Sequence, residues 1–165
     1  MSRSFCHGIC AFVVLSALSM PAWAQDTSLS LSGLNATRGL PVEMRADNLR
    51  VDNNTGETVF SGNAVMGQGD MRLAASVITI IYTPGNTQRI KRLEAQGSVT
   101  LVTADEAAEA DRAIYEIEAG TVTMHGDVIL TQGENVLSGD TLFVNLETGQ
   151  GQMRGNVRTI IKTTP

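Results

Sequence analysis

The sequence contains few of the side chains on which metal centres, covalent catalysis and nucleic-acid binding depend. Both cysteines, Cys6 and Cys10, lie within the first ten residues, so the chain beyond them has no thiol for a disulfide or a metal. Beyond residue 7 there is one histidine, His125, too few for a multi-histidine metal site. Aromatic residues make up 4% of the chain, and 17 acidic residues outnumber 12 basic ones. Base stacking and phosphate neutralisation need more than this, so we expect no nucleic acid, metal or cofactor.

The first 24 residues have the features of a secretory signal peptide. Arg3 precedes a mostly apolar stretch from Phe5 to Met20, and Ala22-Trp23-Ala24 matches the A-x-A cleavage pattern. An uncleaved anchor is the alternative, but the stretch is short for a membrane span, which needs roughly 20 apolar residues. We therefore predict cleavage after Ala24 and export across a membrane. The polar residues 25–40 are predicted to be a flexible leader, and residues 163–165 a short tail.

The region between leader and tail, residues 41–162, is predicted to be one domain built from four repeats. Each repeat opens at an Asp or Ser, has a Gly nine residues later, and has a second Gly followed by Asn, Ser or Asp. The opening residues are Asp47, Ser76, Asp111 and Asp140, and the second glycines are Gly62, Gly97, Gly126 and Gly155. The period is about 29 residues, with one six-residue insertion between Gly85 and Gly97. Such a period is typical of stacked or meandering repeat architectures.

Within the repeats, nearly every segment alternates between apolar and polar residues, which indicates β-strands. Turn sequences rich in Gly, Asn and Asp divide residues 42–162 into eight runs, and short turns between runs favour an antiparallel meander. Each run has a small residue near its middle, where strands bend or bulge: Ala46, Gly62, Ala75, Gly97, Ala110, Gly126, Gly139 and Gly155. Eight successive bends predict one crease across the sheet. The fold class is therefore all-β, with bent strands forming a V-shaped trough.

The alternation also predicts which side chains line the trough. Counting by twos from the crease selects a mostly apolar set: Leu49, Val51, Phe60, Met66, Ile78, Ile80, Leu101, Tyr115, Ile117, Met124, Val128, Leu130, Leu142, Val144 and Met153. Residues before the bend, such as Leu73 and Leu137, fit only if a β-bulge shifts the alternation by one residue at the Asp or Ser step. These side chains are candidates for an apolar binding surface. The alternative is that they form an ordinary core.

Polar candidates for chemistry are few. Asp47, Asp111, Asp127 and Asp140 recur at the bends, where Asp favours local backbone hydrogen bonds. A carboxylate pair acting on a polysaccharide is the enzymatic alternative, although the regular repetition of these residues favours a structural role. The outward-facing His125 is expected to be a surface residue.

The repeated motifs resemble the OstA-like domain family. The resemblance rests on Ala46-Asp47-x-Leu49, on Phe60-x-Gly62-Asn63-x-Val65 with Gln68-Gly69, and on their recurrence as Gly126-Asp127-Val128 and Gly139-Asp140-Thr141-Leu142. It covers about residues 41–161 and is strongest to the soluble lipopolysaccharide-transport members of the family. It implies a β-jellyroll in the periplasm whose groove shields lipid A acyl chains. It also implies two partners, an inner-membrane LptC-like protein and an outer-membrane LptD-like protein.

Assembly is expected at the two ends of the meander, since an open meander leaves its first and last strands unpaired. These strands lie near residues 41–52 and 151–162, and unlike edges that pair give an open, head-to-tail filament. Fraying of residues 158–165 is the alternative. The cluster Arg89, Lys91 and Arg92 is a candidate for contacts with lipid headgroups, or else a solubilising patch. The competing function is a secreted structural β-repeat that assembles without lipid.

Overall fold

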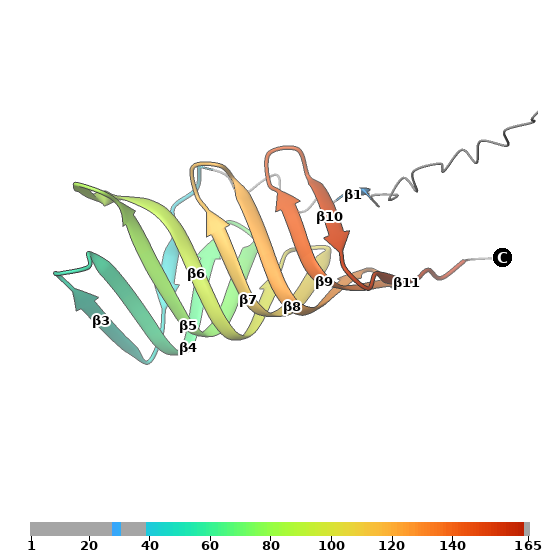
Figure 1. The fold of residues 1–165 in the computed structure, drawn as a ribbon, viewed down its shortest axis with the longest axis horizontal. Coiled ribbons are helices and arrows are strands. Elements are labelled where there is room, and N and C mark those ends of the chain that lie inside the picture. The colour runs from blue at the N-terminus through green and yellow to red at the C-terminus, as the bar shows by residue number, and fades with distance from the viewer. Residues whose placement is uncertain (1–27, 31–38, 164–165) are drawn as a thin grey trace, which may run out of the picture.

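The structure is a computed structural model, and it describes residues 28–30 and 39–163. These residues form one antiparallel sheet of 11 strands (Figure 1). The strands are β1 (Ser28–Ser30), β2 (Glu43–Arg45), β3 (Asn48–Asp52), β4 (Glu57–Gln68), β5 (Met71–Thr83), β6 (Asn86–Val102), β7 (Glu106–Glu116), β8 (Thr121–Gln132), β9 (Asn135–Asn145), β10 (Gln150–Arg154) and β11 (Arg158–Ile160). The expected all-β class is therefore confirmed. In the described part of the chain, no helix has the length and apolarity that a membrane crossing requires.

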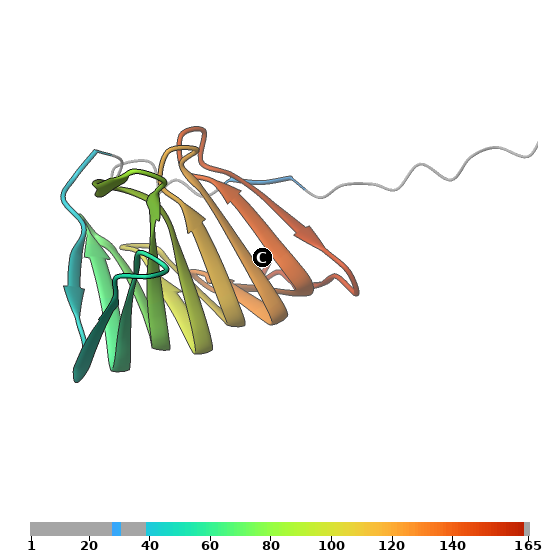
Figure 2. The same cartoon turned by 60° about the vertical axis from the view of Figure 1, so that its left-hand side comes forward.

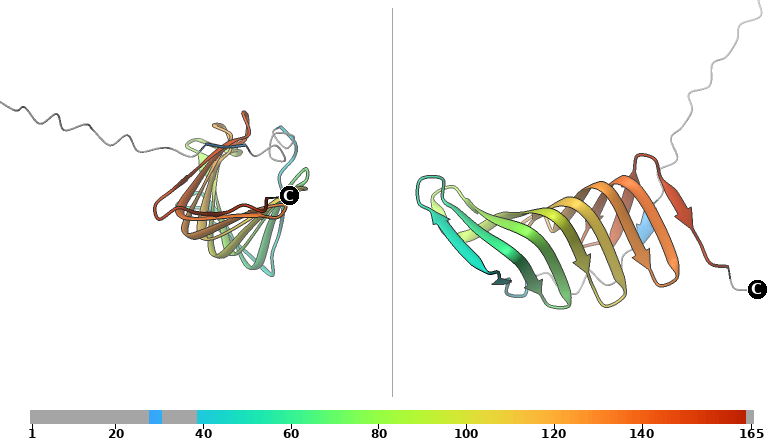
Figure 3. Two further views of the ribbon diagram at one scale, coloured as in Figure 1. Left: turned by 90° about the vertical axis from the view of Figure 1, so that its right-hand side faces the viewer. Right: turned by 90° about the horizontal axis from the view of Figure 1, so that it is seen from below.

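Each long strand bends near its middle, and the bends lie in a row along the lower side of the molecule (Figure 2). They divide the sheet into two walls. The first wall consists of β3, the first halves of β4, β6 and β8, the second halves of β5, β7 and β9, and β10. The second wall consists of β2, the remaining halves and β11. A view along the long axis shows the two walls meeting at the bends (Figure 3).

The bends are made by consecutive residues with positive φ. Gly126 and Asp127 have φ of 86° and 42°, and the Gly-Asn and Gly-Ser pairs of the other repeats repeat this conformation. Gly adopts positive φ without steric cost, and Asn and Asp tolerate it better than other side chains do. The pair adds one residue to its strand, because two residues, 126 and 127, face the single residue Asp140 on β9. The pair Gly-[Asn/Ser/Asp] at the second Gly of each repeat therefore marks the residue added to the strand at the crease.

The bulge explains the shift in alternation on the facing strands. On β5, the buried side chains are Leu73 and Ala75 before the bend and Ile78 and Ile80 after it, so the spacing changes from two to three at Ser76. The same step occurs at Asp111 on β7 and at Asp140 on β9. Side chains of both walls thus point into one interior, which forms the hydrophobic core.

The ends of the sheet differ from its middle in one respect. The first and last predicted runs each break into two short strands at the crease, β2 with β3 and β10 with β11. In the described part of the chain, β2, β3 and β11 each pair on one side, and β10 has only the three-residue β1 on its second side, so fewer ladder hydrogen bonds hold the bend continuous. The six-residue insertion makes β6 the longest strand, at 17 residues. Its extra residues are absorbed by two register shifts opposite Ile81, Tyr82 and Thr83.

Part of the leader is also ordered into the sheet. Ser28–Ser30 form β1, which pairs with β10 and extends the first wall at its C-terminal end (Figure 1). The sequence predicts residues 25–40 to be a flexible leader in which Leu29, Leu31 and Leu34 could form a short strand if a partner supplied an edge. In the structure, Leu29 lies in β1 and the edge is β10 of the same chain, whereas Leu31 and Leu34 lie outside the described residues. The predicted signal peptide, residues 1–24, lies outside the described residues.

Candidate functional site

The interior between the two walls is apolar and almost completely filled. Side chains from both walls meet there, and the cavity between Leu101, Leu130 and Leu142 measures about 10 Å³. The two walls face each other, and the apolar side chains of both point into the space between them. The interior is therefore an apolar core between two walls.

The predicted lining residues lie at three depths. Eleven are buried in this core: Met66, Ile78, Ile80, Leu101, Tyr115, Met124, Val128, Leu130, Leu142, Val144 and Met153. Phe60 and Ile117 are half-buried and pack against it. Leu49 and Val51 are 60% and 58% exposed. The interior also contains Met71 and Leu146, both fully buried. Counting back by twos from Leu73 would have selected Met71.

Leu49 and Val51 are exposed because of where β3 lies. They pair with Phe60 and Thr58 of β4 and so face the inner side of the first wall. The strand is at the end of the sheet, with a neighbour on one side (Figure 1). The opposite end exposes Val157, Ile160 and Ile161, with Ile160 on β11 62% exposed. At that end Thr159 pairs with Leu137 and Ile160 with Val136, so Thr159 faces the interior and Ile160 faces outward. The apolar interior thus continues into exposed apolar side chains at the β3 end of the sheet.

One hydrogen bond crosses the interior from wall to wall. The Tyr115 hydroxyl of the first wall donates to Oε1 of Gln68 in the second wall at 2.8 Å, and both side chains are buried. The Gln68 amide in turn donates to the backbone carbonyl of Leu40 at 3.0 Å. Parting the walls at this position would break this buried hydrogen bond. A hydrogen bond is directional and apolar packing is not, so the bond also fixes how the two walls are positioned. Gln68 was not predicted, since the sequence signal at this position was that of a turn.

A second polar group lies at the margin of the interior. Glu106, at the start of β7, accepts a hydrogen bond from the Gln132 amide at 3.0 Å, and its other carboxylate oxygen is buried without a partner. Burial raises the pKa of Glu106 above its ordinary value, because desolvation disfavours the charged form. The neighbouring Asp105 carboxylate raises the pKa of Glu106 further, whereas the hydrogen bond from Gln132 opposes this shift.

The basic cluster is largely engaged with carboxylates. Arg89 forms an ion pair with Glu118 at 2.6 Å, and Arg92 one with Glu94 at 2.7 Å. Lys91 is exposed. The three residues lie in the insertion-bearing first half of β6.

The recurrent Asp residues support the crease. Asp47 accepts a hydrogen bond from the Asn63 amide at 2.9 Å, and Asp140 accepts one from Asn156 at 3.0 Å. Their Cβ atoms lie so close to the crease glycines that a Cβ on Gly62 would be 3.0 Å from that of Asp47.

Among the described residues, no group of three His, Cys, Asp or Glu side chains is placed to hold a metal ion. His125 is half-buried, with Nδ1 3.2 Å from the Thr141 hydroxyl.

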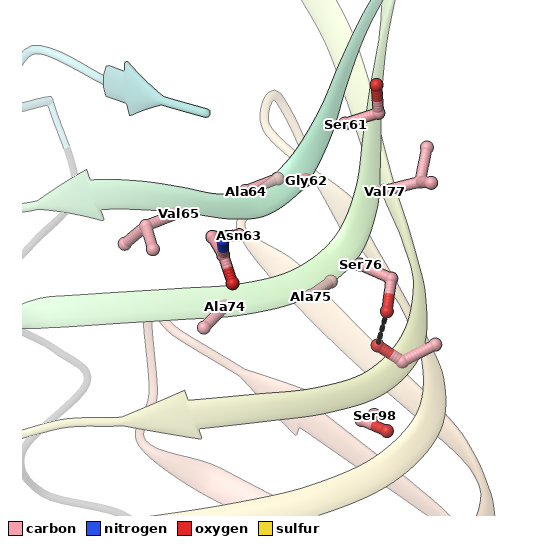
Figure 4. A pocket seen from close by; sticks show the side chains of 11 residues that line it. Ser61, Gly62, Asn63, Ala64, Val65, Ala74, Ala75, Ser76, Val77 and Ser98 are labelled. Carbon is pink, nitrogen blue, oxygen red and sulfur yellow. Dashed lines mark hydrogen bonds between the residues drawn. The ribbon is translucent and has the colours of Figure 1, made fainter. Parts of the chain in front are cut away.

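A shallow depression of about 600 Å³ lies on the outer side of the crease between the first and second repeats (Figure 4). It is lined by small residues, among them Ser61, Ala74, Ser76 and Ser98. Here Ser76 replaces the Asp of the other repeats and donates a hydrogen bond to the Gly97 carbonyl at 3.1 Å. The lining carries no charged side chain, so it offers no acid, base or metal ligand.

The fold and the site define an all-β jellyroll whose distinctive surface is an apolar interior and not a cluster of reactive groups. A family model described as LptA/(LptD N-terminal domain) LPS transport protein matches residues 43–150. An uncharacterized protein of Rhizobium meliloti (strain 1021) is 30% identical over 146 residues, covering 84% of this chain and 78% of that one. The crystal structure of LptH, described as the LptA homologous periplasmic component of the lipopolysaccharide transport device of Pseudomonas aeruginosa, has a TM-score of 0.68. It is 16% identical and covers 77% of this chain and 99% of that chain.

The chain therefore belongs to the LptA/(LptD N-terminal domain) family of LPS transport proteins. This is a family of transport components and not of known enzymes. The resemblance to the OstA-like domain is confirmed. The likeness to LptH shows that the two proteins share a fold.

Proposed function

We propose that this protein is a non-enzymatic periplasmic bridge that carries lipopolysaccharide between two membranes, with the acyl chains held between its walls. The observation that carries the proposal is the apolar interior, which runs along the sheet and reaches solvent at Leu49 and Val51 of β3. Exposing one CH₂ to water costs about 0.8 kcal/mol, so a twelve-carbon chain costs roughly 9 kcal/mol outside such an interior. Cleavage after Ala24 would release the bridge into the periplasm.

The filled interior implies that lipid enters by parting the walls. Acyl chains that replace the contacts between walls leave the lining residues in apolar surroundings, so separation carries little hydrophobic cost. Met66, Met124 and Met153 lie in this interior, and Met side chains adapt to differently shaped neighbours. Lys91 is proposed to contact headgroup phosphates, whereas Arg89 and Arg92 would first have to leave Glu118 and Glu94.

Head-to-tail assembly and the two membrane partners complete the proposal. The strands β2 and β3 at one end and β11 at the other have an open side, and β10 has β1 on its outer side; these are the ends of the sheet at which further strands would add. An inner-membrane LptC-like protein would pair at one end and an outer-membrane LptD-like protein at the other. Unlike edges that pair in this way extend the two walls from one copy to the next.

The filled interior also favours a second candidate, a structural β-repeat that assembles without lipid. In that case the walls stay closed around the cavity of about 10 Å³ at Leu101, Leu130 and Leu142. In-cell photocrosslinking separates the two functions. A photoreactive residue replaces Val128, which is fully buried, and in a matched variant its neighbour Ile129, which is on the outer face and 42% exposed.

Lipopolysaccharide adducts from position 128 and not from 129 are expected for the bridge. Tyr115 and Glu116 provide a second inner and outer pair on β7. Exported, folded protein that gives no adduct at either inner position would leave the lipid-free structural repeat as the better account.

A further inference from the structure

The edge of β10 is already occupied by a strand from the same chain. β1 pairs antiparallel with β10, with Ser28 opposite Gln152, Leu29 opposite Gly151 and Ser30 opposite Gln150. The pairing covers three of the five residues of β10. A strand edge that natural sheets must protect is thus closed here by a short segment of the leader.

The direction of β1 matches that of β3. Seven successive antiparallel pairings lead from β3 to β10, so β3 and β10 run in opposite directions. β1 is also antiparallel to β10 and therefore parallel to β3. A second copy stacked end to end, with the alternation of strands continued, would place its β3 where β1 now lies.

The inward side chains match as well. Leu29 is half-buried against the core and lies opposite Gly151, which is buried and has no side chain of its own to fill the wall. On β3, the inward side chains are Leu49 and Val51. With all five residues of β3 and β10 paired, Val51 would lie opposite Gly151 and Leu49 opposite Met153. β1 therefore has one inward apolar side chain where β3 has two.

We propose that the β10 edge is the acceptor site for the β3 edge of a second copy, and that β1 fills this site in cis as a displaceable plug. The inference rests on the proposed head-to-tail assembly and specifies its contact and its competitor. Exchange replaces a three-residue pairing with a five-residue one and covers two apolar side chains that are exposed in the single copy. The plug keeps an isolated copy from associating until its concentration, or a partner, favours the exchange.

The test locks and unlocks the plug in the exported, processed protein. Ser28→Cys with Gln152→Cys places two cysteines at directly opposed positions, and the predicted mature chain has no other cysteine. Directly opposed residues lie within disulfide range. Leu29→Asp removes the inward apolar contact that holds the plug. Association is measured by sedimentation velocity over a range of concentrations, with circular dichroism as the check of folding.

Oxidation of the cysteine pair is expected to raise the protein concentration needed for self-association by tenfold or more. Reductant is expected to return that concentration to its original value. Leu29→Asp is expected to lower it by about tenfold, because a half-buried Leu contributes roughly that factor. A mixture of Arg50→Cys and Gln152→Cys chains should form an intermolecular disulfide, since these positions face each other in the proposed register.

The inference is overturned if the oxidised and reduced forms associate equally, if oligomers form without the Arg50–Gln152 crosslink, or if no form associates. Photocrosslinking to lipopolysaccharide at Val128 on the same samples reports the cargo separately. If lipid adducts form but locking β1 does not change self-association, the plug is refuted and the transport function stands. If locking β1 changes self-association but no lipid adducts form, the plug stands and the transport function is refuted.

Discussion

A methyl group added at the crease provides a sharp test of how the sheet bends. Gly126 has a φ of 86°, and a Cβ placed on it would lie 2.8 Å from the Cβ of Asp111 on the neighbouring strand. Gly133 has a φ of 57° in a turn, with nothing within 4 Å of its Cβ position. Both Gly→Ala substitutions impose left-handed strain of about 1–2 kcal/mol. Only Gly126→Ala also forces two strands apart.

The extra loss of stability expected for Gly126→Ala arises because the new methyl group would clash with the Cβ of Asp111. The Cβ of Asp111 is fixed by its backbone, so a change of rotamer relieves the carboxylate but not this contact. Overpacking of this kind typically costs about 1–3 kcal/mol. Gly126→Ala is therefore expected to lower the free energy of unfolding by about 2–5 kcal/mol, and Gly133→Ala by about 1–2 kcal/mol. Urea unfolding followed by circular dichroism measures both.

Two double variants identify the mechanism. Asp111→Gly removes the offending Cβ and should recover the overpacking part of the loss when combined with Gly126→Ala. Asp111→Ala retains the Cβ and should recover little. Equal losses for Gly126→Ala and Gly133→Ala, or equal rescue by the two Asp111 substitutions, would refute the close approach of the strands at the crease.

Three further predictions concern the interior. Val128→Asp buries an unpaired carboxylate and should destabilise the fold by at least about 3 kcal/mol, whereas the exposed Ile129→Asp should cost under about 1 kcal/mol in the same urea titration. Tyr115→Phe should lose about 1–2 kcal/mol with its wall-to-wall hydrogen bond; Tyr82→Phe, whose hydroxyl lies 3.4 Å from its acceptor, should lose less. Glu106→Gln should raise stability at pH 7, because the pKa of Glu106 is raised on folding and its charged form opposes the folded state. That gain should fade as the pH falls through the raised pKa toward 4.5, and a pH-independent gain would contradict it.

The repeat made most of the fold predictable from the sequence. The turn residues were separated by runs of regular length, and the small residue in each run marked the bend. The turns at Gly69, Gly85 and Gly133 all join consecutive strands of the sheet. Even the shift of alternation at Ser76 was required by the positions of Leu73 and Ile78. Local signals sufficed here because each strand pairs with its neighbour in sequence.

Features that depend on the ends of the sheet were not predictable in this way. Alternation assigned Leu49 and Val51 to the inner face correctly, but it contains no information on whether a second wall covers them. The pairing of β1 with β10 joins residues more than 120 positions apart, and three residues of Ser-Leu-Ser have no distinctive strand pattern. Alternation also gave no sign that the walls close on each other, because a groove lining and a dry core have the same composition.

The closed interior bears on how the proposed transport would work. At the crease, the chain is continuous, and inner bulges such as that at Gly126 have paired strands on both sides, so the walls can separate only by opening at the margin away from the bends. That margin is where Gln68 ends β4 and meets Tyr115. The hydrogen bond between them is worth about 1 kcal/mol net, far less than the roughly 9 kcal/mol that one twelve-carbon chain gains on leaving water. Under the proposed function, this difference favours opening of the walls by an acyl chain, whereas water gains nothing from the apolar lining and would leave them closed.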